Sequence, residues 1–417
     1  MQLPGFDKLP SLRRCQILTN LGNQLNSLGR CVEALATWTR ALSIDLNFVI
    51  ALGNRGYGLT QYARGLYDPE HRSIFLYFAH RDLSAALSPR AKYEGSAYQE
   101  AKAFFATKKA EVESRIDVRR AKRAIRMDGY AIGASKGERL YREWTLRQRL
   151  FLNPLNDLGA HTIAAYDMLS LPSFTTAIGE PPSLIGFFNQ MKQEFVSGRW
   201  LLYEGLHVDG VHFSDRQVTI FNTLDYPSYS LAVEKVKAAY RIGYSLLDKI
   251  AFFLNDYAKL GVVPQQVYFK TIWYKDGDKK KGIRQELAQS RNLSLRGLYW
   301  LTKDLFDPEL QDVMEPDAQA LYVIRNHIEH SYLKIHEVLM PRNQRDDFED
   351  AWTDRLAYSV QRSDFDAKTL QVFRLARAGL IYLSLGMHRE EQMRAQRQPE
   401  GQKMPMSLDL CQDAWKR

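Results

Sequence analysis

The chain has 417 residues, 45% of them hydrophobic and 12% aromatic, a composition that excludes an intrinsically disordered protein and predicts two or three packed domains. Its net charge of +9 comes from 57 Lys+Arg and 48 Asp+Glu, and is compatible with a nucleic-acid partner without requiring one. Three scattered cysteines without a Cys-x-x-Cys pair argue against a disulfide framework or a zinc site. No signal sequence and no apolar run of ~18–20 residues is found, so we expect a cytoplasmic protein without membrane contact.

Residues 11–105 contain a helical repeat with tetratricopeptide-like (TPR-like) spacing. Small residues such as Gly22 would let two antiparallel helices approach, while Trp38 would fill the space between them. Gly56 follows Gly22 at the ~34-residue period of such repeats. We therefore assign residues 1–105 to TPR-like helical repeats, which would bind a protein partner or a regulator. The alternative is a pair of helical hairpins that simply packs on the rest of the chain.

The middle region, residues 106–225, is first basic and then aromatic-rich, with helical periodicity. Its residues 106–127 are dense in Lys and Arg, and would either follow a nucleic-acid backbone or form a solvated linker helix. The block RQRLFLNPLNDL at 147–158 contains an Asn-Pro step that should interrupt a helix. Some alternation at 208–221 indicates strand character.

Residues 226–395 contain helical segments joined by short or medium connections, which predicts a four-helix bundle. Ser228 is the expected N-cap of the first segment. The segments are 228–259, 295–306, 317–336 and 366–393. The stretch 262–274 is rich in β-branched and aromatic residues and indicates a strand, while residues 396–417 form a polar tail. The predicted fold class is therefore all-α with a small β addition.

The third segment of the bundle carries an unusual polar group. Leu321, Ile324, Ile328 and Ile335 form a helical apolar stripe, and beside it lie Arg325, Asn326, His330 and Tyr332. A guanidinium binds phosphate bidentately, and an imidazole transfers protons near neutral pH. This combination suits a phosphodiester substrate.

Other polar residues receive weaker roles. Asp248 lies near the apolar face of the first segment and needs a partner there. Three consecutive lysines, Lys279, Lys280 and Lys281, occupy a Gly-flanked loop; they would capture RNA electrostatically or simply be exposed. The residues that we interpret as structural or solvated neighbours are His327, Glu329 and His336.

The string Arg325-Asn326-His327-Ile328-Glu329-His330, followed by Ser331-Tyr332, resembles the Arg-x4-His-x-Tyr motif of the toxin-like branch of the HEPN superfamily. The resemblance implies a homodimer formed through the HEPN bundle, in which two copies of the third helix make one composite site. It implies a ribonuclease without metal or cofactor, acting by 2′-hydroxyl attack and leaving 2′,3′-cyclic phosphate and 5′-hydroxyl ends. The setting would be a toxin or an anti-phage defence effector.

The same resemblance implies roles for the site residues. His330 would transfer the proton, Arg325 would bind the scissile phosphate, and Asn326 would position either of them. Tyr332 would support the site, and Asp248 would orient Arg325 or His330. Two alternatives stay open: a non-catalytic module that binds protein or RNA, in which Arg325 and His330 are a structural pair, and the toxin half of a pair whose nucleotidyltransferase partner modifies Tyr332.

Overall fold

The structure is a computed structural model that describes residues 5–89, 91, 96–177, 179–288, 291–307, 318–337, 354, 356–397 and 406–416. These residues are mainly helical, with 3-10 turns and a two-stranded sheet, which confirms the all-α class with a small β addition. None of the helices in these ranges is both long and apolar enough to cross a membrane.

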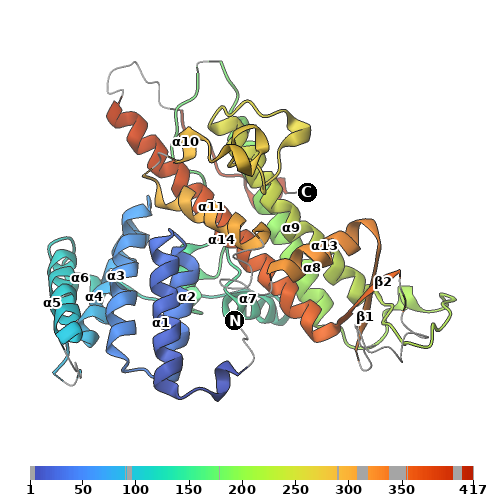
Figure 1. The fold of residues 1–417 in the computed structure, drawn as a ribbon, viewed down its shortest axis with the longest axis horizontal. Coiled ribbons are helices and arrows are strands. Elements are labelled where there is room, and N and C mark those ends of the chain that lie inside the picture. Colours follow the sequence, from blue (N-terminus) through green and yellow to red (C-terminus); the bar gives the residue numbers. More distant parts are fainter. Residues whose placement is uncertain are drawn as a thin grey trace.

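A single long helix, α14 (Arg362–Arg397), crosses the middle of the molecule. Figure 1 shows the N-terminal helices on one side of it and α8 and α9 on the other. Between residues 372 and 387 every residue of α14 is buried except Arg374. A helix that is buried on all sides belongs to a core, so α14 is the element that joins the two halves. At ~1.5 Å per residue it spans about 54 Å.

The N-terminal half consists of helical hairpins, as the sequence predicts. Its helices are α1 (Ser11–Ser27), α2 (Cys31–Ile44), α3 (Val49–Gly65), α4 (Pro69–Ala86), α5 (Ser96–Glu113) and α6 (Val118–Ala124). A Cβ atom on Gly22 would lie 2.5 Å from the indole nitrogen of Trp38, and one on Gly56 would lie 2.7 Å from Cγ of Leu83. Both glycines therefore permit the close helix contacts expected of them. The TPR-like assignment itself stays a prediction.

The other half is a bundle around α14. It contains α8 (Ser183–Leu206), α9 (Leu231–Tyr257), α11 (Leu293–Phe306) and α13 (Ala318–His330), with the short α10 (Gln285–Ala288) in a connection. The N-cap of α9 is Ser230 rather than Ser228, because the Ser230 hydroxyl accepts from the Val233 amide at 3.3 Å. Gly205 lies so close to Val236 that a Cβ would approach to 2.6 Å. Helix α8, which precedes residue 226, is thus packed tightly against α9.

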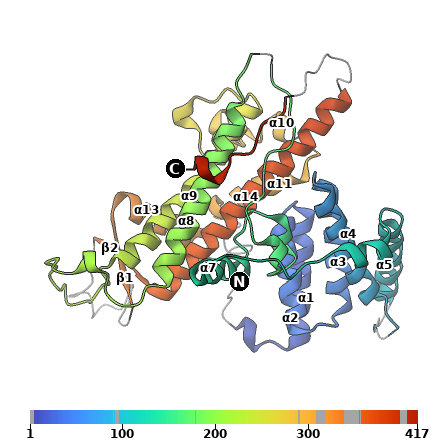
Figure 2. The ribbon, with the colours of Figure 1, turned by 180° about the vertical axis from the view of Figure 1, so that it is seen from behind.

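A buried segment links the two halves, and we call it the seam: residues 150–157, which follow α7 (Lys136–Gln148) and end in the 3-10 helix Pro154–Asp157. Figure 2 shows α7 beside α14 from behind. Asp157 accepts hydrogen bonds from Tyr62 of α3 at 2.9 Å and from Arg377 of α14 at 2.6 Å. The same carboxylate therefore fastens the hairpins to the bundle.

Three sequence-based elements are wrong. The helix predicted through residue 336 ends at His330, and Tyr332–His336 is instead a strand, β1, paired in parallel with β2 (Ala357–Gln361). The stretches 208–221 and 262–274 contain no strand, only turns, 3-10 segments and, in the second, an isolated bridge from Tyr274. Trp273 and Tyr274 of the second stretch are buried because they pack on Tyr299 of α11, not because they pair in a sheet.

Candidate active site

Helix α13 is held on α9 through its backbone carbonyl groups. Tyr240 donates its hydroxyl to the Leu321 carbonyl at 2.5 Å, and Arg241 donates to the Ile328 carbonyl at 2.7 Å. Carbonyls in the last turn of a helix have no partner within the helix, so Arg241 supplies one at the end of α13. The apolar stripe of Leu321, Ile324 and Ile328 is buried as predicted. The opposite, polar side of α13 is thereby presented outward.

Arg325 is the centre of the polar group on α13. Its Nη1 lies 3.2 Å from Oδ1 of Asn326 and 3.4 Å from Nε2 of His330. Because a guanidinium only donates hydrogen bonds, Nε2 of His330 is the acceptor in this contact. His330 is exposed and Arg325 is half-buried. The structure thus brings together three residues predicted from the sequence, at a position that solvent reaches.

A buried tyrosine and a half-buried aspartate of α9, Tyr244 and Asp248, face Arg325. The Arg325 guanidinium carbon lies 6.0 Å from the centre of the Tyr244 ring. Burial raises the pKa of Asp248, while a hydrogen bond from the Phe269 amide at 2.9 Å and the charge of Arg325 oppose that rise. Asp248 therefore lies close enough to act on Arg325 electrostatically, although no carboxylate within the described ranges forms an ion pair with Arg325.

Tyr244 is a site residue that the sequence analysis missed. Its side chain is 6% exposed, and its hydroxyl has no hydrogen-bond partner among the described residues. Burial, followed by the charge of Asp248, raises the pKa of this phenol. The available signal was its spacing of four residues from Asp248, which places both on one helix face. An unsatisfied buried hydroxyl lowers the free energy of unfolding. We therefore expect the Tyr244 hydroxyl to serve a purpose other than stabilising the fold.

Tyr332 is not in the cluster around Arg325. It lies on β1, and its hydroxyl is 2.8 Å from that of Tyr229. Burial and this hydrogen bond raise its pKa to about 12. Arg325 and Tyr332 were expected to share one line along a helix, and that geometry is wrong because α13 ends before Tyr332.

The neighbouring polar residues have structural partners. His327 donates its Nδ1 proton to the Val323 carbonyl at 2.8 Å and stacks on Tyr358 of β2. His336 is fully buried against the Asp225 carbonyl, 3.0 Å away, and burial lowers its pKa. Glu329 pairs with Arg241 at 3.6 Å. These contacts match the structural roles expected of all three.

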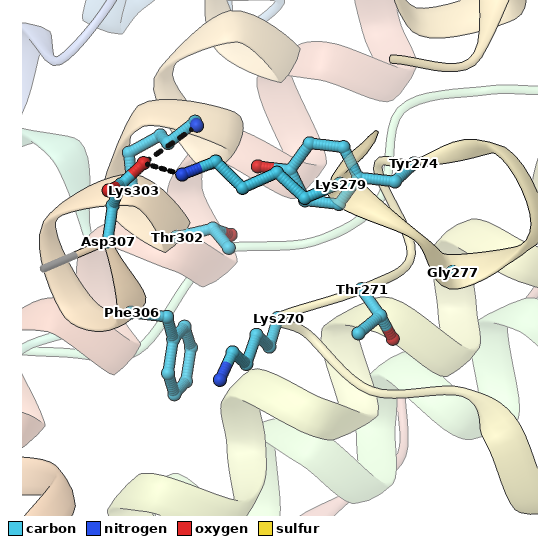
Figure 3. Close-up of a pocket in the computed structure, with 9 residues that line it drawn as sticks. All are labelled: Lys270, Thr271, Tyr274, Gly277, Lys279, Thr302, Lys303, Phe306 and Asp307. Atoms are coloured by element: carbon cyan, nitrogen blue, oxygen red, sulfur yellow. Dashed lines mark hydrogen bonds and ion pairs between the residues drawn. The ribbon is translucent and has the colours of Figure 1, made fainter. Parts of the chain in front are cut away.

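The three lysines form a 3-10 turn, Lys279–Lys281. Lys279 is 2.9 Å from Asp307, and Lys281 is 3.0 Å from Asp276. Figure 3 shows Lys279 and Lys303 converging on Asp307 in a cavity of about 140 Å³, with Lys270 on the opposite wall. Two of the lysines are therefore already neutralised within the chain, and their role in RNA binding stays a prediction.

No group of three or more His, Cys, Asp or Glu side chains suited to a metal ion occurs in the part of the chain that the structure describes. The arrangement on α13 instead offers a cation that has an imidazole and an amide each within hydrogen-bond distance of it. Such a set can hold an anionic oxygen and transfer a proton beside it.

Comparison with known families gives one match. Residues 175–390, more than half of the chain, match the family described as LA2681-like HEPN. The matched range includes α8, α9, α11, α13 and α14 up to residue 390, and therefore the whole polar group on α13. No curated protein and no solved structure matches the chain.

Proposed function

The chain belongs to the LA2681-like HEPN family, and we propose that it is a metal-independent endoribonuclease whose site is formed by Arg325, Asn326 and His330. Family membership indicates a nuclease or RNA-related function in general. The observation that supports the finer proposal is the contact between the Arg325 guanidinium and the His330 ring, at 3.4 Å, without an ion-paired carboxylate among the described residues. A cation left with neutral partners is available to a phosphate.

The proposed reaction uses the nucleophile that RNA carries. A neutral His330 takes the proton of the 2′-hydroxyl, the 2′-oxygen attacks the adjacent phosphorus, and the bond to the 5′-oxygen breaks. A second imidazole, in its protonated form, protonates the leaving 5′-oxygen. Arg325 donates to the non-bridging oxygens, whose charge grows in the transition state. The products are a 2′,3′-cyclic phosphate and a 5′-hydroxyl.

A homodimer would supply the second imidazole. The nearest other histidine on α13, His327, is bonded to the Val323 carbonyl and stacked on Tyr358, so it is not positioned as an acid. His330 lies at the surface near the end of α13. Two copies of α13 that meet there would bring together two histidines and two arginines. We place this activity in a toxin or anti-phage defence setting, with the TPR-like hairpins binding a regulator.

The test is cleavage of an end-labelled RNA by the purified full-length protein in EDTA, with the product ends identified. We expect cyclic-phosphate and 5′-hydroxyl ends, and a loss of about 10²–10⁴-fold for His330→Ala. The matched control is His327→Asn, which changes the other histidine of the same helix turn and should keep most of the activity. Cleavage that survives His330→Ala, or ends with 3′-hydroxyl groups, would exclude this mechanism.

The two alternative functions predict different outcomes of the same experiment. Tight RNA or protein binding without cleavage would favour a non-catalytic module. Modification of Tyr332 by a nucleotidyltransferase would favour a toxin half whose activity a partner controls. In the free chain the Tyr332 hydroxyl is bonded to Tyr229, so modification would have to break that contact first.

A further inference from the structure

The largest of the cavities described here lies away from α13, between the N-terminal hairpins and the bundle. This cleft has a volume of about 740 Å³ and is lined by α1, α2, the end of α7 and one face of α14. Ligand pockets for small molecules typically have ~300–1,000 Å³. The cleft is therefore of a size that accepts a nucleotide-sized molecule.

Three acidic side chains line the cleft: Asp364 is exposed on α14, and the other two are bonded within the fold. Glu33 binds Arg30 at 3.1 Å and also accepts from the Tyr382 hydroxyl. Asp157 is bound by Tyr62 and Arg377. The charge of Asp157 also acts on Arg149, but the lining carries seven Lys or Arg side chains against three carboxylates, so the cleft is positively charged.

Two arginines of the cleft have only neutral hydrogen-bond partners. Arg374 donates to the Gln148 side chain at 2.8 Å and to the Gln148 carbonyl at 3.2 Å, and Arg149 donates to the Asp157 carbonyl at 3.4 Å. Neither forms an ion pair with a carboxylate in the described ranges. Arg374 is the exposed residue in the otherwise buried stretch of α14 between residues 372 and 387. Its side chain lines this cleft.

The two guanidinium groups lie close enough to repel each other. The pKa of Arg374 is lowered, first by the partial burial of its guanidinium and then by the charge of Arg149. Arg149 is placed there by the end of α7, where its backbone turns into the left-handed region at φ 57°. Two neighbouring guanidinium groups whose hydrogen-bond partners are neutral form a site for a doubly charged anion, since each can bind a phosphate bidentately.

Part of the cleft wall is apolar, although α2 also contributes polar and charged side chains to the lining. It is formed by leucines of α1 and small apolar residues of α2, namely Leu18, Leu21, Leu25, Val32 and Ala36. An inorganic anion would leave this wall unused, whereas a nucleotide presents phosphates at one end and a flat base at the other. We propose that the cleft binds a nucleotide, with its phosphates on Arg149 and Arg374 and its base against the leucines of α1.

This site is separate from the RNA chemistry of α13 and does not depend on it. Its α14 wall continues on the other side of the helix into Val372 and Phe373, which pack against Gly243 of α9. Helix α9 in turn carries the Tyr244 and Asp248 side chains that face Arg325. The nucleotide would therefore bind on one face of the helix whose other face supports the candidate active site.

The experiment is isothermal titration calorimetry of the full-length protein with ATP, GTP, CTP and UTP, and with tripolyphosphate and a hexaglutamate peptide. We expect one or more nucleotides to bind once per chain and about tenfold more tightly than tripolyphosphate. Arg374→Gln and Arg149→Asn should each weaken that binding by about tenfold or more. Asn tolerates the left-handed backbone at position 149. His330→Ala should bind as wild type does, even if that variant cleaves no RNA.

The matched control is Arg120→Gln, which removes the same charge from an exposed position on α6, and should leave binding unchanged. Thermal unfolding followed by circular dichroism shows whether each variant is folded. The proposal is overturned if no nucleotide binds, or if folded Arg374→Gln and Arg149→Asn bind as wild type does. Binding of tripolyphosphate as tight as that of a nucleotide, or binding of the peptide alone, would also overturn it.

Discussion

The two arginines that bind the seam from α8 and α14 differ in their partners from the arginine of α13. Arg199 is 2% exposed and bonded to both Asp167 oxygens at 2.8 Å, and Arg377 is paired with Asp157 at 2.6 Å. Arg325 instead contacts an amide, an imidazole and an aromatic ring. A buried cation requires an anion from the chain itself. A half-buried arginine with neutral partners can instead bind an anionic ligand. We therefore interpret Arg199 and Arg377 as structural and propose a functional role for Arg325.

The largest stability effect should come from Asp157→Ala in the seam. The substitution leaves the Arg377 charge buried and removes the Tyr62 contact, so we expect the free energy of unfolding to fall by about 3–5 kcal/mol. Urea denaturation measures the loss. The control is Glu143→Ala, which breaks the exposed ion pair with Arg147 and should cost less than about 0.5 kcal/mol. Equal losses in the two variants would refute the distinction between seam and surface.

Asp167→Asn should give a smaller loss that depends on pH. Burial alone would raise the pKa of Asp167, but the charge and hydrogen bonds of Arg199 outweigh it and hold the pKa below its ordinary value. The carboxylate therefore stabilises the fold above the unfolded-state pKa of ~3.9, and this stabilisation is lost as the pH falls through the lower folded-state pKa. We expect the free energy of unfolding of Asp167→Asn to be about 2 kcal/mol below that of wild type at pH 7. This difference should shrink below pH ~4. A difference that grows in acid would contradict this assignment.

Of the three substitutions, Tyr244→Phe should change the free energy of unfolding least, and it should raise it where the other two lower it. Removing a buried hydroxyl that has no partner among the described residues should raise the free energy of unfolding by about 1 kcal/mol. If the hydroxyl serves the site, RNA cleavage should fall at the same time by about tenfold. Thermal unfolding and initial cleavage rates measure the two effects. A destabilised variant with full activity would show that the hydroxyl has a structural partner instead.

Helical periodicity was sufficient to predict most of the bundle. Helices α9, α11 and α14 follow long amphipathic or apolar patterns, and the Arg325–His330 spacing was visible directly. The end of α13 could not be predicted, because the spacing of Leu333 and Ile335 fits a strand as well as a helix. What decides is β2, which lies more than twenty residues later. Local sequence carries no information about such a distant partner.

The residues missed by the sequence analysis share a physical cause. In the sequence, Tyr244 looks like one more core residue of the apolar helix α9. Its position beside Arg325 is seen only once α13 packs on α9. The cleft residues Arg149 and Arg374 are 225 positions apart, and each looks like an ordinary surface cation in the sequence. Their proximity arises from the packing of α7 on α14, which a single sequence does not specify.

The central claim is that Arg325 serves a ligand rather than the fold. Its most direct test is the single-turnover cleavage of a defined RNA in EDTA by Arg325→Ala, compared with wild type and with Arg13→Ala, which changes an exposed arginine of α1. We predict a loss of at least about 100-fold for Arg325→Ala, unchanged cleavage for Arg13→Ala, and the same unfolding temperature for all three. Wild-type cleavage by a folded Arg325→Ala protein would contradict the claim.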